Sequence, residues 1–394
     1  MKNISITLAL FLGFGFSNAQ TQEYSAEQSS KFALDIYKQF AGESEKNIFF
    51  SPFSLSIAMG MTYAGAEGET KAQIADVFNF PINDENLHKE LGSLQNQMVN
   101  KGNKGVEISI ANQLWADKLY KFKCSYLRNV KKAYKAPVKR MPFRTEADKC
   151  RVEINKWVED KTKNRIVDLL PEGSISDMTT LVLTNAIYFK GQWDNKFEEE
   201  DTFDEAFLTA TGQTVSSRMM NTQDKYNIYQ GNSIQMLELP YAGKDFSMLV
   251  VLPNEDTPLK EIEKNITLEK LNHYISLLVE SDVRVSFPKF KFDSEFALKP
   301  TLSKMGMPIP FSNAADLSRM SGNKDLKIDE VFHKAFVEVS EEGTEAAAAT
   351  AVVIVRKSVT IPVEFKANRP FMFIIRENST GSILFMGRVN NPNN

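Results

Sequence analysis

Residues 341–358 read Glu-Glu-Gly-Thr-Glu-Ala-Ala-Ala-Ala-Thr-Ala-Val-Val-Ile-Val-Arg-Lys-Ser. The stretch begins with two acids and Gly343, continues through small residues to Ala351, and then becomes a β-branched run that ends on the basic pair Arg356 and Lys357. Small side chains pass between neighbouring strands with little steric hindrance, and β-branched residues favour extended backbone. The composition indicates a segment that is first exposed to a protease that cuts after basic residues and then enters a sheet as a strand.

The alternative for this stretch is an alanine-rich helix or a plain linker, because alanine favours helix. Thr344, Thr350 and the valine run do not continue a helix. Alternate residues of a strand face opposite sides. One face of an inserted strand would carry the small or β-branched residues Thr344, Ala346, Ala348, Thr350, Val352 and Ile354. The charge of Glu345 would fall on the other face, in contact with water.

The chain has 394 residues, of which 42% are hydrophobic and 25% charged, so it can form one large domain or two ordinary ones. The formal net charge of -3 argues against a nucleic-acid-binding protein. Helical and strand patterns alternate without a repeat, and no Gly/Ser/Pro-rich linker divides them. We therefore expect a single domain of mixed class.

The N-terminus has the pattern of a secretory signal peptide, residues 1–19. Lys2 precedes a short apolar run, and Ser17-Asn18-Ala19 ends on small residues suited to cleavage before Gln20. An uncleaved anchor is the alternative. No later stretch is long and apolar enough for a membrane span of ~18 residues. The sequence therefore predicts a secreted, extracellular protein with no membrane contact.

Cysteine and histidine patterns indicate neither a metal site nor an active site. The two cysteines, Cys124 and Cys150, each lie near the start of a predicted helix, and they form either one disulfide or two free thiols. The three histidines lie in no ligand or catalytic motif. The chain has no Gly-x-Ser-x-Gly elbow, no His-Glu-x-x-His motif and no phosphate-binding loop. We expect no catalytic residue, no cofactor and no metal, and hence no enzyme.

Apolar periodicity predicts four helices, at 29–40, 51–63, 123–134 and 146–161. Alternating or continuous apolar runs predict strands at 106–114, 180–189, 234–239, 246–252, 283–287, 371–376 and 383–389. Two long segments, 194–215 and 341–362, match neither pattern. A loop of roughly 20 residues within a compact domain usually has a function.

Five motifs, in order along the whole mature chain, resemble those of the serpin family. They read NIFFSPFS at 47–54, GAEGET at 65–70, LTNAIYFKGQW at 183–193, DEVFHK at 329–334, and NRPF at 368–371 with FMGRV at 385–389. The chain is therefore identified as a serpin with an antithrombin-like hinge in its reactive loop. The resemblance implies a mixed α+β serpin fold with three β-sheets, about nine helices and an exposed reactive-centre loop at about 341–362. Residues 20–394 would form this single domain.

The resemblance also implies a mechanism, in which the native state is metastable and the protein acts as a suicide inhibitor. A serine protease attacks the bait bond and forms an acyl-enzyme. The freed loop then inserts into the central sheet as a strand of roughly 14 residues, about 45 Å long, and carries the protease with it. Distortion of the oxyanion hole and triad stops deacylation. The covalent 1:1 complex is not released, so each inhibitor molecule acts once. The free inhibitor is expected to be a monomer.

The family places the bait residue seventeenth when Glu341 is counted as the first. That residue is Lys357, with Ser358 on the leaving side, and Arg356 is the rival if the loop is shorter by one residue. Either residue selects a trypsin-like protease, whose specificity pocket carries a carboxylate. The hinge comprises Glu341, Glu342, Gly343, Thr344, Glu345, Ala346, Ala347, Ala348, Ala349 and Thr350. Its small residues favour an inhibitor over the alternative, a non-inhibitory serpin that acts as a binding, carrier or chaperone protein.

Two structural sites follow by the same resemblance. The shutter, a polar cluster beneath the central sheet, comprises Ser51, Ser54, Asn185 and His333. We interpret His333 as structural, because a buried histidine in a polar cluster is usually a satisfied core group. Trp193 and Lys289 match the breach, where the loop first enters the sheet, and Lys289 is expected to pair with Glu341.

The basic residues and glycosylation motifs of the surface indicate a function less specifically than the family motifs do. Family members that bind heparin use a basic helix, but here 86–99 holds only His88 and Lys89 among basic residues and histidines. A denser basic stretch includes Lys131, Lys132 and Lys135, and it is either a solvated helix face or a weak polyanion site. Asn265 and Asn378 begin glycosylation motifs.

Overall fold

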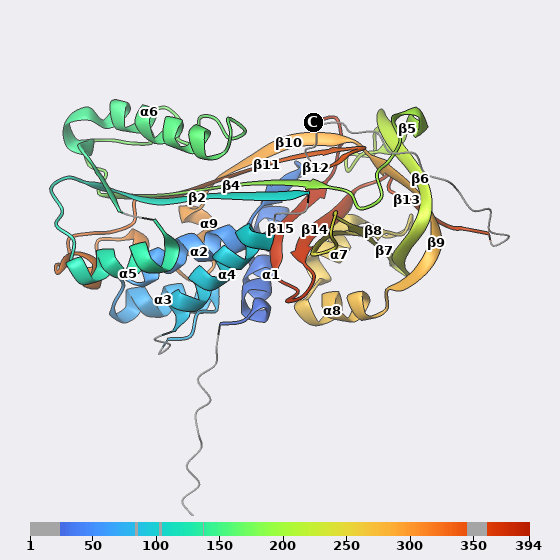
Figure 1. Ribbon diagram of the computed structural model, residues 1–394. Helices are drawn as coiled ribbons and strands as arrows, with labels where there is room; N and C mark the ends of the chain where they lie inside the picture. Colours follow the sequence, from blue (N-terminus) through green and yellow to red (C-terminus); the bar gives the residue numbers. More distant parts are fainter. Residues whose placement is uncertain (1–23, 83–85, 102–104, 137, 345–360) are drawn as a thin grey trace, which may run out of the picture.

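The computed structural model describes residues 24–82, 86–101, 105–136, 138–344 and 361–394 (Figure 1). Ten α-helices lie in this part: α1 (Ala26–Glu43), α2 (Pro52–Tyr63), α3 (Gly68–Phe78), α4 (Leu87–Lys101), α5 (Cys124–Tyr134), α6 (Phe143–Lys161), α7 (Leu259–Asn265), α8 (Leu268–Ser276), α9 (Lys299–Lys304) and α10 (Ser318–Ser321). Two 3-10 turns are η1 (Glu199–Asp201) and η2 (Ile309–Phe311). No helix within the described ranges has the length and apolarity that a bilayer crossing requires.

A six-stranded sheet extends along the molecule, between α6 on one face and α2, α4 and α5 on the other (Figure 1). Its spatial order is β10 (Phe290–Ala297), β11 (Glu330–Ser340), β12 (Gly343–Thr344), β4 (Leu181–Gln192), β2 (Val106–Asp117) and β3 (Lys139–Met141). The central strands are long, and almost every residue of β4 is buried. Such continuous burial is typical of a strand that is covered on both faces.

The second sheet has nine strands in the described residues. Its order is β1 (Ile48–Phe50), β15 (Ile383–Val389), β14 (Phe371–Glu377), β8 (Phe246–Pro253), β7 (Ile234–Pro240), β6 (Thr214–Gln230), β9 (Val279–Pro288) and β13 (Val363–Lys366), with β5 (Thr202–Leu208) paired to β6. The long strand β6 pairs with both β7 and β9. It thereby joins two of the three expected sheets into one continuous hydrogen-bonded ladder.

Helix α2 is buried along its whole length, because its sequence is apolar or small on every side. Ser51 caps its N-terminus by accepting a hydrogen bond from the Ser54 amide, and Pro52 occupies the first helical position. The helix packs under β4 and β2 and against β15. It therefore carries Ser51 and Ser54 to the underside of the six-stranded sheet.

Helix α6 covers the opposite face of the same sheet. A separate apolar cluster lies between them, in which the rings of Trp115 and Trp157 meet edge to face with centroids 5.3 Å apart. Cys150 is buried in this cluster, whereas Cys124 is exposed at the start of α5. Both are free thiols, so of the two alternatives, one disulfide or two free thiols, the structure has the free thiols.

The four predicted helices and seven predicted strands each match an element of the same type, and only residues 51, 123 and 180 of the predicted ranges fall outside it. The segment 194–215, which matched no pattern, contains η1, all of β5 and the start of β6. Strand β5 lies at the edge of its sheet and buries only Thr202 and Phe207. A strand with so few buried positions lacks the alternation that reveals strands in sequence.

A buried ion pair fastens the last strand to the helical layer. The Arg388 guanidinium donates to both carboxylate oxygens of Glu263 at 3.1 Å, and the Tyr37 hydroxyl donates to the same carboxylate at 2.6 Å. The two charged side chains are only 3% and 5% exposed. Arg388 also donates to the Lys46 carbonyl at 3.0 Å. The network links α1, α7 and β15.

Replacing Glu263 by Ala should lower the free energy of unfolding by about 3–5 kcal/mol, because the Arg388 charge would remain buried without a partner. Urea denaturation followed by circular dichroism measures the change. As control, Glu280→Ala removes one member of an exposed pair with Lys225 at 3.5 Å, which should change the same quantity by no more than about 1 kcal/mol. Equal effects of the two substitutions would refute the stabilising role of the buried pair.

Candidate functional site

The candidate site is the seam between β4 and β11. The two strands pair directly and in parallel from Glu330 opposite Val182 to Ala335 opposite Ile187. Farther along, the short strand β12 lies between them and pairs antiparallel with both. The first residues of the predicted hinge thus already occupy a place within the sheet.

Gly343 and Thr344 fit this place for steric reasons. Gly343 has a φ of 146°, and a Cβ atom at this position would lie 2.0 Å from the Gly191 carbonyl oxygen, so only glycine allows the approach. The Thr344 side chain is buried, and its hydroxyl and the Tyr241 hydroxyl form a hydrogen bond of 2.7 Å. The hinge is therefore held by shape at Gly343 and by a hydrogen bond at Thr344.

Two acids fasten the chain just before this strand. The Lys289 ammonium lies 2.7 Å from a carboxylate oxygen of the buried Glu341, which also accepts a hydrogen bond of 2.9 Å from the Thr202 hydroxyl. Burial raises the pKa of Glu341, but the hydrogen bonds and charge of Lys289 outweigh it and hold the pKa below its usual value. Glu342 pairs with Lys196 at 2.5 Å. The predicted contact between Lys289 and Glu341 is present.

Trp193 holds the same turn from the side. Its backbone amide donates to the Glu342 carbonyl and its indole N–H to the Ser340 carbonyl, both at 3.0 Å. The indole stacks on Tyr241 with centroids 4.7 Å apart. Tyr241, which the sequence did not single out, thus contacts both the tryptophan and the hinge.

The four predicted shutter residues meet below the middle of the seam. The His333 Nδ1 lies 2.5 Å from the Asn185 Oδ1, and the Ser51 amide donates to the His333 Nε2 at 3.0 Å. The Asn185 amide donates to the Ser54 carbonyl and hydroxyl at 2.9 and 2.7 Å. It also donates to the Asn112 Oδ1. The cluster joins β11, β4, β2 and α2.

The hydrogen bonds fix the state of the imidazole. Because the Nε2 accepts from a backbone amide, the proton is on the Nδ1 and the ring is neutral. Burial lowers the pKa of His333 from 6.5 to about 3, against the opposing effect of the hydrogen bond with Asn185. Both ring nitrogens are therefore engaged in hydrogen bonds, and the structural role of His333 stays a prediction.

Sequence reasoning missed four residues of the site: Asn112, Tyr241, and the partners of the two hinge acids, Thr202 and Lys196. An asparagine within the apolar run of β2 is itself a signal, since a buried amide needs partners. Tyr241 follows β7 in an ordinary turn and gave no such signal. The remaining predicted positions lie outside the described residues: Glu345, Ala346, Ala347, Ala348, Ala349, Thr350, Arg356, Lys357 and Ser358.

Asn378, one of the two glycosylation candidates, belongs to the turn between β14 and β15. Its side-chain amide donates to the Lys244 carbonyl at 2.9 Å, and its Oδ1 accepts from the Ser247 hydroxyl at 2.7 Å. Asn265, the other candidate, is exposed and its side chain donates to the Glu261 carbonyl at 3.0 Å. Glycosylation at both stays a prediction.

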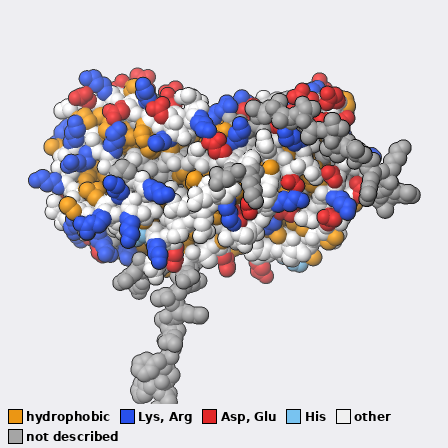
Figure 2. All heavy atoms as spheres, in the orientation of Figure 1, with side chains coloured by type: hydrophobic (Ala, Val, Ile, Leu, Met, Phe, Trp, Pro, Cys, Tyr) orange, Lys and Arg blue, Asp and Glu red, His pale blue; other side chains and the backbone are white. Residues whose placement is uncertain are grey.

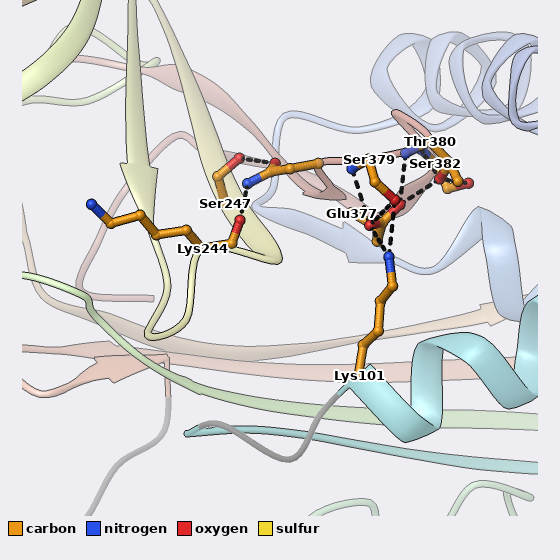
Figure 3. Close-up of polar contacts among 8 residues, drawn as sticks. Lys101, Lys244, Ser247, Glu377, Ser379, Thr380 and Ser382 are labelled. Atoms are coloured by element: carbon orange, nitrogen blue, oxygen red, sulfur yellow. Dashed lines mark hydrogen bonds and ion pairs between the residues drawn. The ribbon is translucent and has the colours of Figure 1, made fainter.

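The same turn is built around a fully buried carboxylate (Figure 3). Glu377 accepts hydrogen bonds from the amides and hydroxyls of Ser379 and Thr380, and from the Lys101 ammonium at 2.5 Å. Burial raises the pKa of Glu377, but these donors lower it to about 2. Lys101 is the last residue of α4, so the ion pair attaches that helix to the nine-stranded sheet.

Comparisons with known proteins agree with this geometry. The family model described as serpin (serine protease inhibitor) matches residues 27–392. Human Serpin B4 is 42% identical over 93% of this chain and 99% of its own length, and rat leukocyte elastase inhibitor A is 40% identical over 94% and 100%. Uncleaved ovalbumin superposes with a TM-score of 0.85 at 31% identity, over 94% of this chain and all of that one.

Human thyroxine-binding globulin in complex with its hormone is also similar, with a TM-score of 0.86 at 32% identity over 94% of this chain and 98% of that one. The expected mixed α+β serpin fold is therefore confirmed.

The expectation of a secreted, extracellular protein is wrong. Serpin B4, Serpin B6 and the leukocyte elastase inhibitors, to which the chain is similar, belong to the intracellular clade B. A basic residue followed by a short apolar run is a pattern of composition, and composition alone did not decide the localisation. The predicted signal peptide at 1–19 lies outside the described residues.

The depressed pKa of His333 predicts a dependence of stability on pH. The unfolded chain binds a proton below about pH 6.5, whereas the folded state binds none until about pH 3. The contribution of neutral His333 to the free energy of unfolding is complete above pH 6.5. It is lost as pH falls, by up to about 1.4 kcal/mol per pH unit. His333→Gln should therefore flatten the fall in unfolding free energy between pH 6.5 and 5.

Urea denaturation at a series of pH values gives this slope, and His273→Gln, at an exposed position, is the control. An unchanged slope in His333→Gln would show that the imidazole titrates freely in the folded protein.

Proposed function

Because the chain belongs to the serpin family, we propose that it inhibits trypsin-like serine proteases and is consumed in doing so. Serpins are inhibitors rather than catalysts. The bait bond is Lys357–Ser358, and residues 20–394 act as one domain and as a monomer. The observation that carries the proposal is the position of β12 between β4 and β11. At the end where the bait segment begins, β12 already separates the two strands, and farther along they pair directly.

The register of β12 supports insertion of the whole small-residue stretch. Thr344 lies opposite Gly191 of β4, and 191 − 181 = 10 further residues would bring Ile354 opposite Leu181, where β4 begins. On the other side, Thr344 lies opposite Val339, and 339 − 330 = 9 further residues would bring Val353 opposite Glu330, where β11 begins. The length of the slot thus matches the run that ends before Arg356 and Lys357.

The same register accounts for the polar cluster. A strand continued from Thr344 would place Thr350 between Asn185 and His333, since 344 + 6 = 350, 191 − 6 = 185 and 339 − 6 = 333. Those two side chains are hydrogen-bonded to each other across the closed seam. Parting the strands breaks this bond, and a threonine hydroxyl can serve as donor and acceptor between them. This register would explain why a polar residue, Thr350, occurs within the alanine run.

The chemistry follows that of any serine protease substrate until its last step. The catalytic serine oxygen attacks the Lys357 carbonyl carbon, the bond to the Ser358 nitrogen breaks, and the new amine leaves with a proton. An ester now joins protease and loop. Insertion of the freed strand adds two ladders of hydrogen bonds and a buried face, and carries the ester to the far end of the sheet. Deacylation stops because the distorted oxyanion hole no longer stabilises the transition state.

A binding or carrier protein is the second candidate function. Similar solved structures include one in complex with thyroxine, so this fold by itself does not decide the function. The matching lengths favour inhibition. A carrier does not require that the space between β4 and β11 has the length of the small-residue stretch. The two experiments below separate the functions, since a carrier would be cleaved without forming a covalent complex.

Lys357→Ala should abolish the SDS-resistant complex with trypsin, because the specificity pocket would lose its cationic partner. The effect should be at least about 100-fold on the association rate, as expected when a charged group that pairs in the pocket is removed. Arg356→Ala is the matched control and should have a smaller effect. Mass spectrometry of the cleaved loop identifies the bond, and cleavage only after Arg356 would move the bait by one residue.

Thr344→Arg should convert the inhibitor into a substrate. Thr344 is 1% exposed within the sheet, and an arginine there would bury an unpaired charge at a cost of several kcal/mol. Insertion would be slower than deacylation, so trypsin should cleave the loop at a similar rate while the covalent band disappears. Thr344→Ser, which keeps a small hydroxyl side chain, is the control. A stable one-to-one complex of Thr344→Arg would contradict the insertion mechanism.

A further inference from the structure

A polar cleft lies at the β13 end of the nine-stranded sheet. Its volume is about 630 Å³, within the range of roughly 300–1,000 Å³ that small-molecule sites have. Its walls are the turn between β6 and β7, the segment that follows β8, and β13 with the residues after it. Among the described residues, every lining residue except Gly231 has an amide or a charged side chain. The cleft is therefore suited to a polar ligand.

One cation and one anion of the cleft are left without a charged partner. Lys366 and Glu364 form ion pairs with residues outside the cleft, at 2.5 and 3.6 Å. The other two charged lining residues, Arg369 and Glu255, form no ion pair with any described residue. Burial lowers the pKa of Arg369, and the charge of Glu255 opposes this effect, so the two charges act on each other without direct contact.

The Arg369 guanidinium is half-buried and fixed in place. Its Nε donates to the Pro253 carbonyl at 2.7 Å, and its Nη1 donates to the Asn368 Oδ1 at 3.0 Å. These two bonds account for two of the five N–H groups of a guanidinium. A planar group held in this way can bind a carboxylate through two of its remaining N–H groups.

The segment that carries Glu255 is also fixed. The Asn254 side-chain amide donates to the Gly231 carbonyl at 3.0 Å, and its backbone amide donates to the Ser233 carbonyl at 2.9 Å. The Thr257 amide donates to the Asn254 carbonyl at 2.9 Å, which closes the turn around Glu255. A cleft whose walls are ordered before binding loses less entropy when a ligand is bound.

Two glutamines add amide groups to the cleft. Gln230 and Gln235 lie opposite each other in the pairing of β6 with β7, so their side chains share one face of the sheet. The Gln235 Oε1 is buried and accepts no hydrogen bond from any described residue. A buried acceptor requires a donor, which the N–H groups of a ligand would supply.

The lining disfavours several classes of ligand. Among the described residues, no aromatic or aliphatic side chain lines the cleft, so a nucleobase has no ring to stack on and a lipid has no apolar wall. Two acids and two cations balance each other in the lining, which disfavours a strongly anionic ligand. Figure 2 shows acidic and basic side chains next to one another on the half of the molecule that holds β7, β8 and β9.

We propose that this cleft binds a small zwitterion, a free amino acid or a short peptide, whose carboxylate contacts Arg369 and whose ammonium group contacts Glu255. The amides of the lining would pair with the other polar groups of the ligand. Binding here does not depend on the proposed inhibitory function, because the hinge is held by other residues, Lys196, Lys289 and Tyr241.

The test measures binding of triglycine and of glycine to the full chain by titration calorimetry. Triglycine is then compared with N-acetyltriglycine, which lacks the ammonium group, and with triglycine amide, which lacks the carboxylate. Each blocked analogue should bind at least about 10-fold more weakly than triglycine, because it loses a hydrogen bond between charged groups. Binding of either zwitterion supports the site, and the tighter of the two identifies the source.

Two variants assign the contacts. Glu255→Gln should weaken triglycine binding by about 10-fold and leave the affinity for N-acetyltriglycine unchanged, because that analogue has no ammonium group to lose. Arg369→Lys keeps the charge but not the planar donors, and it should weaken triglycine and leave triglycine amide unchanged. Asp256→Asn, at the neighbouring exposed position outside the lining, is the control and should bind triglycine as the wild type does.

Thermal melts check that each variant is folded, and the exposed position of Glu255 keeps the test valid if Arg369→Lys is unstable. The proposal is wrong if neither zwitterion binds at millimolar concentration, or if the blocked analogues bind as tightly as triglycine. Equal affinity of Glu255→Gln and the wild type for triglycine would also contradict it.

Discussion

The divided pairing of β4 and β11 is the constraint on which the rest of the structure depends. The strands bond directly as far as Ala335 and Ile187, and beyond that point β12 separates them. Among the described residues only Gly343 and Thr344 occupy this position, although the strands continue on both sides. Every additional residue that entered would gain hydrogen bonds to both neighbours. Under the proposed function, release of the bait segment would extend this strand and so stabilise the fold.

Both faces of the seam contain apolar residues, and only one carries a polar cluster. On the α6 side, one apolar cluster includes Val182 and Ala186 of β4 and Phe332 of β11, so parting the strands there exposes hydrophobic surface. On the α2 side, Leu183 of β4 and Val331 of β11 belong to the main apolar core, and the hydrogen bond between Asn185 and His333 lies beside them. Hydrogen bonds can be exchanged for others with little net change in free energy. The polar cluster is thus the part of the seam where an entering strand can replace the contacts that it breaks.

Buried charged groups fix three parts of the fold. Glu263, Glu341 and Glu377 are buried, and each is satisfied by a cation and by hydroxyl donors from distant parts of the chain. These pairs fix the ends of β15, the hinge and α4. Pairing inside the fold therefore stabilises one conformation.

The sequence by itself determined the fold class, the family motifs and the composition of the hinge, because these depend on local patterns. Pattern and resemblance also predicted that Ser51, Ser54, Asn185 and His333 would meet, and that Lys289 would lie next to Glu341. Tertiary structure alone decided that Thr344 is already within the sheet and bonded to Tyr241, and that Asn112 joins the polar cluster. It also decided that β6 makes one sheet of two. These contacts join residues far apart in the chain, so their existence depends on how strands come together and not on any pattern along the sequence.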